Sequence, residues 1–247
     1  MNLGVHLCSR PDRVAVVTGA GGGIGRSISA TLIQAGWHVV LTGRNILRLR
    51  EVAEAHSSTD TTVIAADLRD NEQLRALSVE VERRFCCLKL LVNNAGHADF
   101  GSLDELTCER IDELFAVNST AAIKLAALFL PQLRRAAPAD IVNIGSEQGT
   151  SARPGRVGYG TSKSALHFAT QALAAECAPY GVRVNAIVPG AVRTPMLAEV
   201  MDGRPLPVTP LGHTVEPTEV AQWVKLLTES RSITAAAIMI DGGMSVT

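Results

Sequence analysis

Tyr159 and Lys163 are the residues whose types and spacing point most directly to chemistry. Side chains four positions apart lie on the same face of a helix, one turn apart. A free phenol has a pKa of about 10, and a nearby ammonium lowers that pKa towards the range useful for proton transfer near neutral pH. Ser146 stands upstream at the expected end of a buried strand, where its hydroxyl could hold a substrate oxygen. Alone, the pair carries little weight, because a helix with a stray tyrosine and a surface lysine has the same pattern.

A glycine-rich loop near the start of the chain indicates a nucleotide cofactor. Residues 19–25 read Gly-Ala-Gly-Gly-Gly-Ile-Gly and follow the β-branched run 14–18. Glycines let the backbone approach a pyrophosphate, and the N-terminus of the next helix supplies N–H donors and a favourable dipole. The spacing departs from the strict G-x-G-x-x-G pattern, because Ile24 occupies one glycine position. A tight turn that merely needs glycine is the alternative.

The end of the second expected strand bears on the choice of cofactor. An acidic residue there would accept from the 2′-hydroxyl of NAD and repel a 2′-phosphate. The sequence instead has Thr42-Gly43-Arg44, with a guanidinium and no carboxylate. Arg44 could bind a 2′-phosphate through two N–H groups, which favours NADP(H) over NAD(H). The alternative is a solvated arginine at the start of the next helix.

Short apolar runs alternate with stretches of helical periodicity along the whole chain. We expect seven strands, at residues 14–18, 38–42, 62–66, 88–92, 141–144, 182–188 and 236–240, with helices between them. This alternation predicts an α/β fold, a single-domain Rossmann-type, doubly wound seven-stranded parallel sheet flanked by helices. We expect an N-terminal tail at 1–12, one domain over 13–247, and a substrate lid at 196–215.

Composition narrows the classes of partner. The 247 residues are 47% hydrophobic, and Lys+Arg 23 against Asp+Glu 24 give a net charge of -1, which argues against nucleic acid. Lys124 interrupts the most apolar helical stretch, so we expect no membrane span, and no signal peptide. Five cysteines without metal-like spacing predict a reduced, cytoplasmic protein without a metal site.

Taken together, these motifs resemble those of the short-chain dehydrogenase/reductase family, in its single-domain branch. The matching residues are Thr18-Gly19-x-x-x-Gly23-x-Gly25, Asp67-Leu68, Asn93-Asn94-Ala95-Gly96, Asn118, Ser146, Tyr159-x-x-x-Lys163, Asn185 and Pro189-Gly190 with Thr194. The ending Ile240-Asp241-Gly242-Gly243-Met244 resembles the 3-oxoacyl-carrier-protein reductase side of the family. The ordered set carries the resemblance, which covers nearly the whole chain.

The resemblance implies a role for each matching residue. Tyr159 would be the general acid in reduction and the base in oxidation, Lys163 would lower its pKa, and Ser146 would hold the substrate oxygen. Asn118, at a local interruption of its helix, would position a water in a proton relay. The cofactor would lie against Gly19, Gly23, Ile24, Gly25, Arg44, Asp67, Leu68, Asn94, Ala95, Gly96, Tyr159, Lys163, Pro189, Gly190, Val192 and Thr194. A homotetramer, or a homodimer, is expected, and the alanine-rich Tyr159 helix would contribute to its interface unless it packs only on its own sheet.

Three residues near these motifs are more polar than the family pattern. His97 follows Asn-Asn-Ala-Gly, and Glu147 and Gln148 follow Ser146. Each could contact substrate, or be an ordinary loop residue or a solvated one. The expected lid leaves a similar choice, because Met196, Leu197, Val200 and Met201 could cover an apolar substrate or simply pack down.

The sequence therefore predicts an NADP(H)-dependent oxidoreductase that interconverts a small or medium ketone and a secondary alcohol. An NAD-dependent alcohol dehydrogenase of the same family, a non-catalytic nucleotide-binding regulator, and an epimerase or dehydratase using the same Tyr-Lys pair are the alternatives. The substrate, its stereochemistry and the physiological direction stay open.

Overall fold

A seven-stranded parallel sheet forms the centre of the molecule in a computed structural model, which describes residues 12–56 and 60–246. The strands are β1 (Val14–Thr18), β2 (His38–Gly43), β3 (Thr61–Ala65), β4 (Leu90–Asn93), β5 (Ala139–Ile144), β6 (Val182–Pro189) and β7 (Ala237–Ile240). Their order is β3-β2-β1-β4-β5-β6-β7, and every neighbouring pair is parallel. The predicted fold class is confirmed. The expected tail at 1–12 lies outside the described residues except for Asp12.

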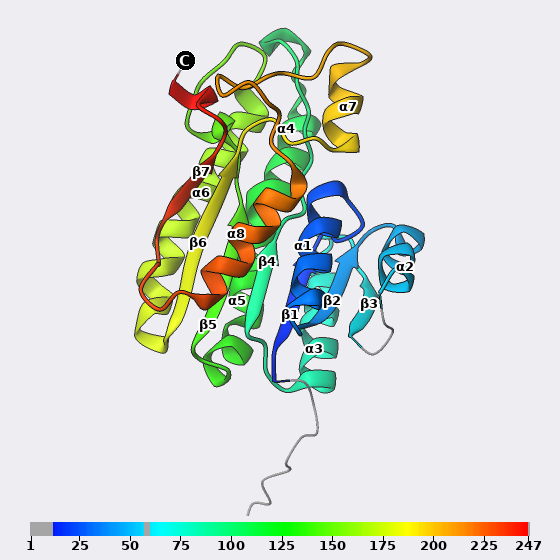
Figure 1. Cartoon of the computed structure of the whole chain (residues 1–247), viewed down its shortest axis with the longest axis vertical. Helices are drawn as coiled ribbons and strands as arrows, with labels where there is room; N and C mark the ends of the chain where they lie inside the picture. Colours follow the sequence, from blue (N-terminus) through cyan, green and yellow to red (C-terminus); the bar gives the residue numbers. More distant parts are fainter. Residues whose placement is uncertain (1–11, 57–59, 247) are drawn as a thin grey trace, which may run out of the picture.

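Helices cover both faces of this sheet (Figure 1). They are α1 (Gly23–Gln34), α2 (Ile46–Glu54), α3 (Asn71–Phe85), α4 (Cys108–Phe115), α5 (Ala121–Arg135), α6 (Val157–Cys177), α7 (Pro195–Met201) and α8 (Pro217–Glu229). Successive side chains of a strand point to opposite faces, so Ala15 and Val17 pack with α1, α2 and α8, while Val14 and Val16 pack with α3, α5 and α6. Burial on both faces explains the nearly continuous apolar character of these strands.

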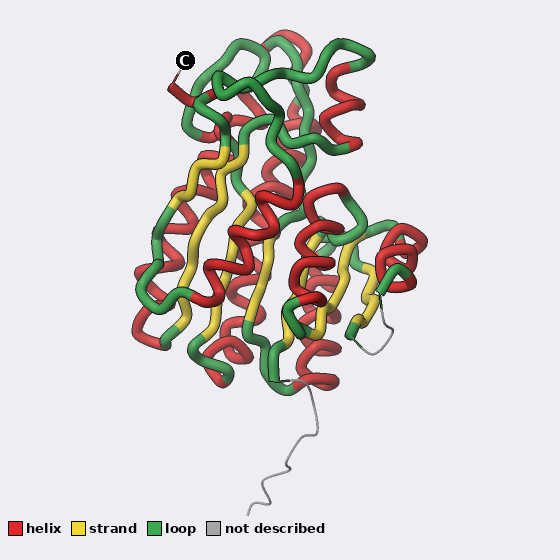
Figure 2. The backbone as a smooth tube through the Cα atoms, viewed as in Figure 1, coloured by secondary structure: helices red, strands yellow, loops and turns green. Residues whose placement is uncertain are grey.

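The carboxyl ends of all strands meet at one edge of the sheet, because the strands are parallel. Figure 2 shows the loops that leave this edge gathered at one end of the molecule, together with α7. The strand order reverses between β1 and β4, which lie side by side although β2 and β3 separate them in sequence. In open α/β sheets, ligands bind outside the carboxyl ends of the strands at such a point. We therefore expect a ligand to bind against the loops after β1, β4, β5 and β6.

The helical segment Cys108–Arg135 is the longest in the fold and combines α4, one π-helical turn and α5. Its length, and a mean hydropathy of 1.6 over its most apolar 18 residues, would suffice to cross a membrane, which the expectation from Lys124 did not anticipate. Helices in the core of a soluble protein have the same composition. Leu114, Leu125 and Phe129 are fully buried in the described fold, which accounts for the apolar residues of this segment.

Candidate active site

The structure brings together the three residues with which the sequence analysis began. Ser146 follows β5, and Tyr159 and Lys163 lie in the first two turns of α6, which packs against β6 and the Ser146 turn. The Lys163 ammonium donates a hydrogen bond of 2.9 Å to the carbonyl oxygen of Ile144, the last residue of β5. Its nitrogen lies 6.0 Å from the centre of the Tyr159 ring. The Ser146 hydroxyl lies close enough to the phenol to lower its pKa. Hydroxyl, phenol and ammonium therefore converge at the carboxyl edge of the sheet.

Two glycines make this close approach possible. A Cβ added to Gly160 would lie 2.8 Å from the carbonyl oxygen of Gln148. One added to Gly149 would lie 2.9 Å from the carbonyl carbon of Lys163. Backbone atoms cannot move aside cheaply, so any larger residue would push the Ser146 turn away from α6. The Gly160 in the Tyr159-Gly160-Thr161-Ser162-Lys163 stretch thus has a packing reason of its own.

Burial shifts the pKa values of Lys163 and Tyr159. It lowers the pKa of the Lys163 ammonium to about 8, because the low-dielectric interior disfavours the charged form. It also raises the pKa of the Tyr159 phenol, and the nearby Ser146 hydroxyl opposes that rise. Both shifts follow from removing a charged form from water. The expected activation of Tyr159 by Lys163 stays a prediction.

Asn118 lies inside the π-helical turn Ala116–Thr120, at the helix interruption expected for it. The extra residue of a π turn leaves side-chain and backbone groups out of the regular helical pattern. The Asn118 amide binds both backbone groups of His97, accepting from its N–H at 2.8 Å and donating to its carbonyl at 2.9 Å. It also donates to the Ser162 hydroxyl at 3.0 Å, and Ser162 donates to the Tyr159 carbonyl at 2.7 Å. Asn118 is thereby fixed beside the Tyr159 turn, and contact of the His97 imidazole with substrate stays a prediction.

The glycine loop is tied to the loop after β4. The Thr18 hydroxyl accepts hydrogen bonds from the backbone N–H groups of Asn94 and Ala95, at 2.9 and 3.0 Å. The Asn94 amide in turn donates to the carbonyls of Thr18 and Gly19. A Cβ on Gly25 would lie 2.2 Å from the Gly19 oxygen, so the loop closes on itself only with glycine there. The sequence analysis quoted Thr18 only as part of the motif and missed its role as the tie.

The N-terminus of α1 is open to a ligand. The capping position, Gly22, offers no side chain to the first-turn N–H groups, and no acidic residue lies in that turn. Unsatisfied N–H donors and the positive end of the helix dipole suit a phosphate. The γ-methyl of Thr194 lies against Gly23, where a Cβ would be only 2.7 Å away. The residues present at this edge therefore fit a dinucleotide, with its pyrophosphate at the start of α1.

Arg44 lies at the end of β2, as predicted, and is exposed. Its charge is the smallest of the causes that lower the pKa of the Asp67 carboxyl. The largest cause of that lowering is Arg69, which binds Asp67 through two nitrogens and also pairs with Glu113 at 3.0 Å. Asp67 is thus held by a residue that the sequence analysis did not single out, while Arg44 has no ion pair among the described residues.

The segment after β6 lies over the glycine loop. Pro189 ends the strand, and the Gly190 N–H donates to the Ile240 carbonyl at 3.0 Å. Val192 pairs with Val215 in an isolated parallel bridge. Thr194 caps α7 by accepting from the Leu197 N–H. These contacts hold both ends of the expected lid near the site.

The expected lid contains one short helix, α7. No apolar residue of α7 is fully buried. Leu197, Val200 and Met201 of α7 are partly buried, and the Met196 side chain is 45% exposed. This apolar face has therefore not joined either core cluster. That arrangement is compatible with a cover over substrate, which stays a prediction.

His167 is a neighbour of the site that the sequence analysis missed. It lies one turn beyond Lys163 on α6, and its Nε2 accepts from the backbone N–H of Ser146 at 3.4 Å. Gly145 makes room for the ring, because a Cβ there would lie 2.2 Å from Nε2. Burial and the Lys163 charge lower the pKa of His167 to about 4, so the ring is neutral and able to accept. The four-residue spacing from Lys163 was the available signal.

The two polar residues after Ser146 have different surroundings. Glu147 is only 2% exposed and therefore is not solvated. Burial raises the pKa of its carboxyl. Gln148 is partly buried, and its side-chain oxygen has no hydrogen-bond partner in the part of the chain that the structure describes. Contact of either with substrate stays a prediction.

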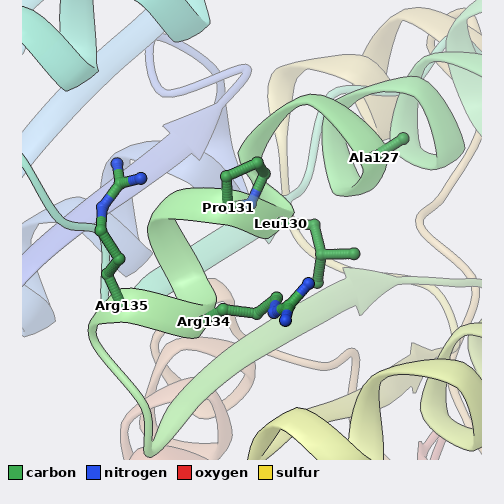
Figure 3. A pocket seen from close by; sticks show the side chains of 5 residues that line it. All are labelled: Ala127, Leu130, Pro131, Arg134 and Arg135. Atoms are coloured by element: carbon green, nitrogen blue, oxygen red, sulfur yellow. The ribbon is translucent and has the colours of Figure 1, made fainter.

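A depression elsewhere on the surface is unrelated to this chemistry. Five residues of α5 line it: Ala127, Leu130, Pro131, Arg134 and Arg135 (Figure 3). Both arginines already have partners, since Arg134 stacks on Tyr180 and Arg135 binds Glu82 and the Cys86 carbonyl. Across the described ranges, no three His, Cys, Asp or Glu side chains form a group that could hold a metal ion.

Comparison with known proteins identifies the family. The short chain dehydrogenase family model matches residues 13–205. The chain belongs to the short-chain dehydrogenase/reductase family. A crystal structure from Brucella melitensis, described as a short-chain dehydrogenase/reductase and glucose/ribitol dehydrogenase, has a TM-score of 0.87 and 29% sequence identity, and the match covers 95% of this chain and 97% of that one.

Two curated relatives match nearly the whole chain at 31–35% sequence identity. An uncharacterized short-chain type dehydrogenase/reductase of Sinorhizobium fredii is 35% identical over 96% of this chain, which spans only 44% of that protein. Carbonyl reductase family member 4 of Xenopus laevis is 31% identical, and the match covers 95% of this chain and 99% of that protein. The chain is thus an oxidoreductase of this family with a nicotinamide cofactor, as expected. The narrower resemblance to 3-oxoacyl-carrier-protein reductases stays a prediction.

Proposed function

We propose that this short-chain dehydrogenase interconverts a ketone and a secondary alcohol with NADP(H), in a reduced cytoplasmic setting. The convergence of Ser146, Tyr159 and Lys163 beside a glycine-lined cradle carries the proposal. The bound nicotinamide supplies the hydride chemistry. The protein has to orient the carbonyl and move one proton at its oxygen.

Each side chain has a role that its contacts support. In reduction, the Tyr159 phenol donates its proton to the carbonyl oxygen while the Ser146 hydroxyl donates a hydrogen bond to the same oxygen. Lys163, held by the Ile144 carbonyl, stabilises the phenolate that results, and the same groups act in reverse during oxidation. Asn118 holds a water that restores the proton. The lid at 196–215 covers the substrate and excludes bulk water.

The preference for NADP(H) depends on Arg44. An exposed guanidinium at the end of β2, without an ion pair among the residues described, suits a 2′-phosphate, and no carboxylate of that turn opposes it. The remaining cofactor contacts proposed are those of the sequence analysis: Gly19, Gly23, Ile24, Gly25, Asp67, Leu68, Asn94, Ala95, Gly96, Pro189, Gly190, Val192 and Thr194.

A Tyr159→Phe variant tests the reaction. Loss of the proton donor should lower kcat for ketone reduction by about 10²–10⁴-fold, the usual contribution of general acid–base catalysis. Cofactor affinity should stay within about 3-fold of wild type, since only one hydroxyl is removed. The measurement is NADPH oxidation with a ketone panel, alongside a cofactor titration. Equal turnover by both proteins would contradict the proposed role of Tyr159.

An Arg44→Ala variant tests the choice of cofactor. We expect wild type to bind NADPH at least about 10-fold more tightly than NADH, and the variant to lose about the 1.4 kcal/mol that this ratio represents. Calorimetric titration of both cofactors into both proteins measures this directly. NADH binding as tightly as NADPH would make Arg44 a solvated residue and favour the NAD-dependent alcohol dehydrogenase.

A further inference from the structure

Arg156 occupies an unusual place next to the reactive phenol. It immediately precedes α6 and is half-buried. Its guanidinium carbon lies 3.6 Å from the centre of the Phe100 ring, a stacked cation–π contact. Phe100 in turn meets the Tyr159 ring edge to face, with centroids 5.3 Å apart. Guanidinium, phenyl ring and phenol therefore form one packed unit, in which Phe100 fixes Arg156 beside the reaction centre.

This guanidinium forms no ion pair with an acidic side chain in the described part of the chain. Its Nη1 makes a long hydrogen bond of 3.4 Å to the adjacent Gly155 carbonyl, and its buried Nε has no acceptor among residues 12–56 and 60–246. Two other shielded arginines differ sharply: Arg110 is bound to Asp99 through two nitrogens, and Arg183 pairs with Asp140 at 2.8 Å. A partly desolvated charge is costly unless it is paired, so the donors of Arg156 call for an anion from outside the described chain.

The charges around Arg156 leave the site positive. Glu147 is a buried carboxyl whose charge acts on Arg156, but no ion pair joins the two side chains among the described residues. Burial raises the pKa of the Glu147 carboxyl, because the low-dielectric interior disfavours its charged form. Arg153 and Arg204 add positive charge, and both donate their hydrogen bonds to backbone carbonyls. Arg204 lies three residues after the end of α7, so the expected lid brings a further cation towards the same place.

We propose that Arg156 binds an oxyanion, foremost a carboxylate, on the substrate itself, so that the enzyme acts on acidic oxo compounds and the matching hydroxy acids. The inference rests on the proposed function and narrows its substrate class. A guanidinium held flat by an aromatic ring presents two parallel donors, which match a carboxylate in two-point contact. A group bound there would anchor the substrate while its carbonyl reaches Ser146 and Tyr159.

Binding without turnover gives the sharpest test. Protein saturated with oxidised cofactor cannot reduce a ketone, so affinity can be measured alone. We would titrate 3-oxobutanoate, 4-oxopentanoate and 5-oxohexanoate, each against its methyl ester, which keeps the ketone and removes the charge. At least one acid should bind about 10–100-fold more tightly than its ester, the range for a charged hydrogen-bonded pair. Equal affinities for every pair would overturn the inference.

Substitutions assign the preference to Arg156. Arg156→Met keeps an apolar stem over Phe100 without the charge and should remove the preference for the acid. Arg156→Lys keeps the charge without the planar fork and should retain part of it. Arg231→Gln is the matched control, because Arg231 is exposed in the turn before β7, at the opposite end of the sheet. Thermal unfolding of each variant verifies the fold, and an acid preference that survives in Arg156→Met overturns the inference.

Two further measurements separate the possible failures. Reduction of neutral ketones by NADPH tests the proposed function alone. Turnover of these ketones without tighter binding of any acid would contradict the Arg156 site and leave the proposed reaction standing. Acid binding through Arg156 without turnover of any ketone would sink only the proposed reaction. Dihydroxyacetone phosphate against dihydroxyacetone gives the phosphate comparison. A larger Arg156-dependent preference there than for any carboxylate would support the oxyanion site and assign it to a phosphate.

Discussion

At the scale of single residues, the packing behind the site makes one histidine sensitive to acid. His167 accepts a hydrogen bond from the Ser146 backbone, and this requires a neutral ring with its proton on the other nitrogen. Burial and the neighbouring Lys163 lower its pKa to about 4, against an unfolded value near 6.5. Protonation therefore breaks the contact and places two cations one helical turn apart.

The free energy of unfolding depends on pH because His167 binds a proton less tightly in the folded state than in the unfolded state. A histidine whose folded pKa is depressed contributes stability above its unfolded pKa, and that contribution is lost as the pH falls towards the folded value. Between pH 6.5 and 4, wild type should lose up to about 3 kcal/mol of unfolding free energy through His167. His167→Gln keeps a possible acceptor but cannot titrate. Urea unfolding of both proteins across this range should show the smaller loss in His167→Gln, and parallel pH profiles would contradict the assignment.

At the scale of elements, the turn from β1 into α1 depends on how closely its own backbone packs. Gly25→Ala should destabilise the protein by about 1–3 kcal/mol, because the new methyl would lie 2.2 Å from the Gly19 oxygen and the backbone has to shift. Gly22→Ala is the matched control in the same loop, since its Cβ would meet only the Gly19 oxygen, at an ordinary 3.4 Å. Thermal unfolding of the two variants measures the difference. Equal loss of stability would show that the loop tolerates no side chain anywhere.

The positions of the strands could be predicted from the sequence better than the contacts between elements. Apolar runs and glycine signals place every strand within two residues at its start, because buried parallel strands and their turns have local patterns. The π turn at Asn118 was expected only by resemblance. Its contact with Ser162, 44 residues away, depends on how α6 packs and has no local signal. Arg156 had a signal that was overlooked, since it precedes Tyr159 by three residues, at the position just before α6.

At the scale of the whole molecule, α6 has an exposed stripe opposite its catalytic face. Phe168 is 73% exposed there, and Ser164, Ala172 and Ala175 share its face at helical spacing. The alanines that suggested an interface divide between two roles, because Ala169 and Ala174 are buried within the subunit. A large exposed aromatic residue flanked by small ones is a contact that a second copy of the chain could cover.

Association through this stripe would place the Tyr159 helices of two subunits side by side, so the dimer and the site would share one element. Phe168→Asp should therefore reduce the mass measured by light scattering, from tetramer to dimer or from dimer to monomer, because a desolvated carboxylate would face its own copy across the symmetry axis. Val79→Asp on α3 is the control, with a side chain 64% exposed and no expected role in assembly. An unchanged mass for Phe168→Asp would assign the interface to another face, and a monomeric wild type would exclude the expected homotetramer.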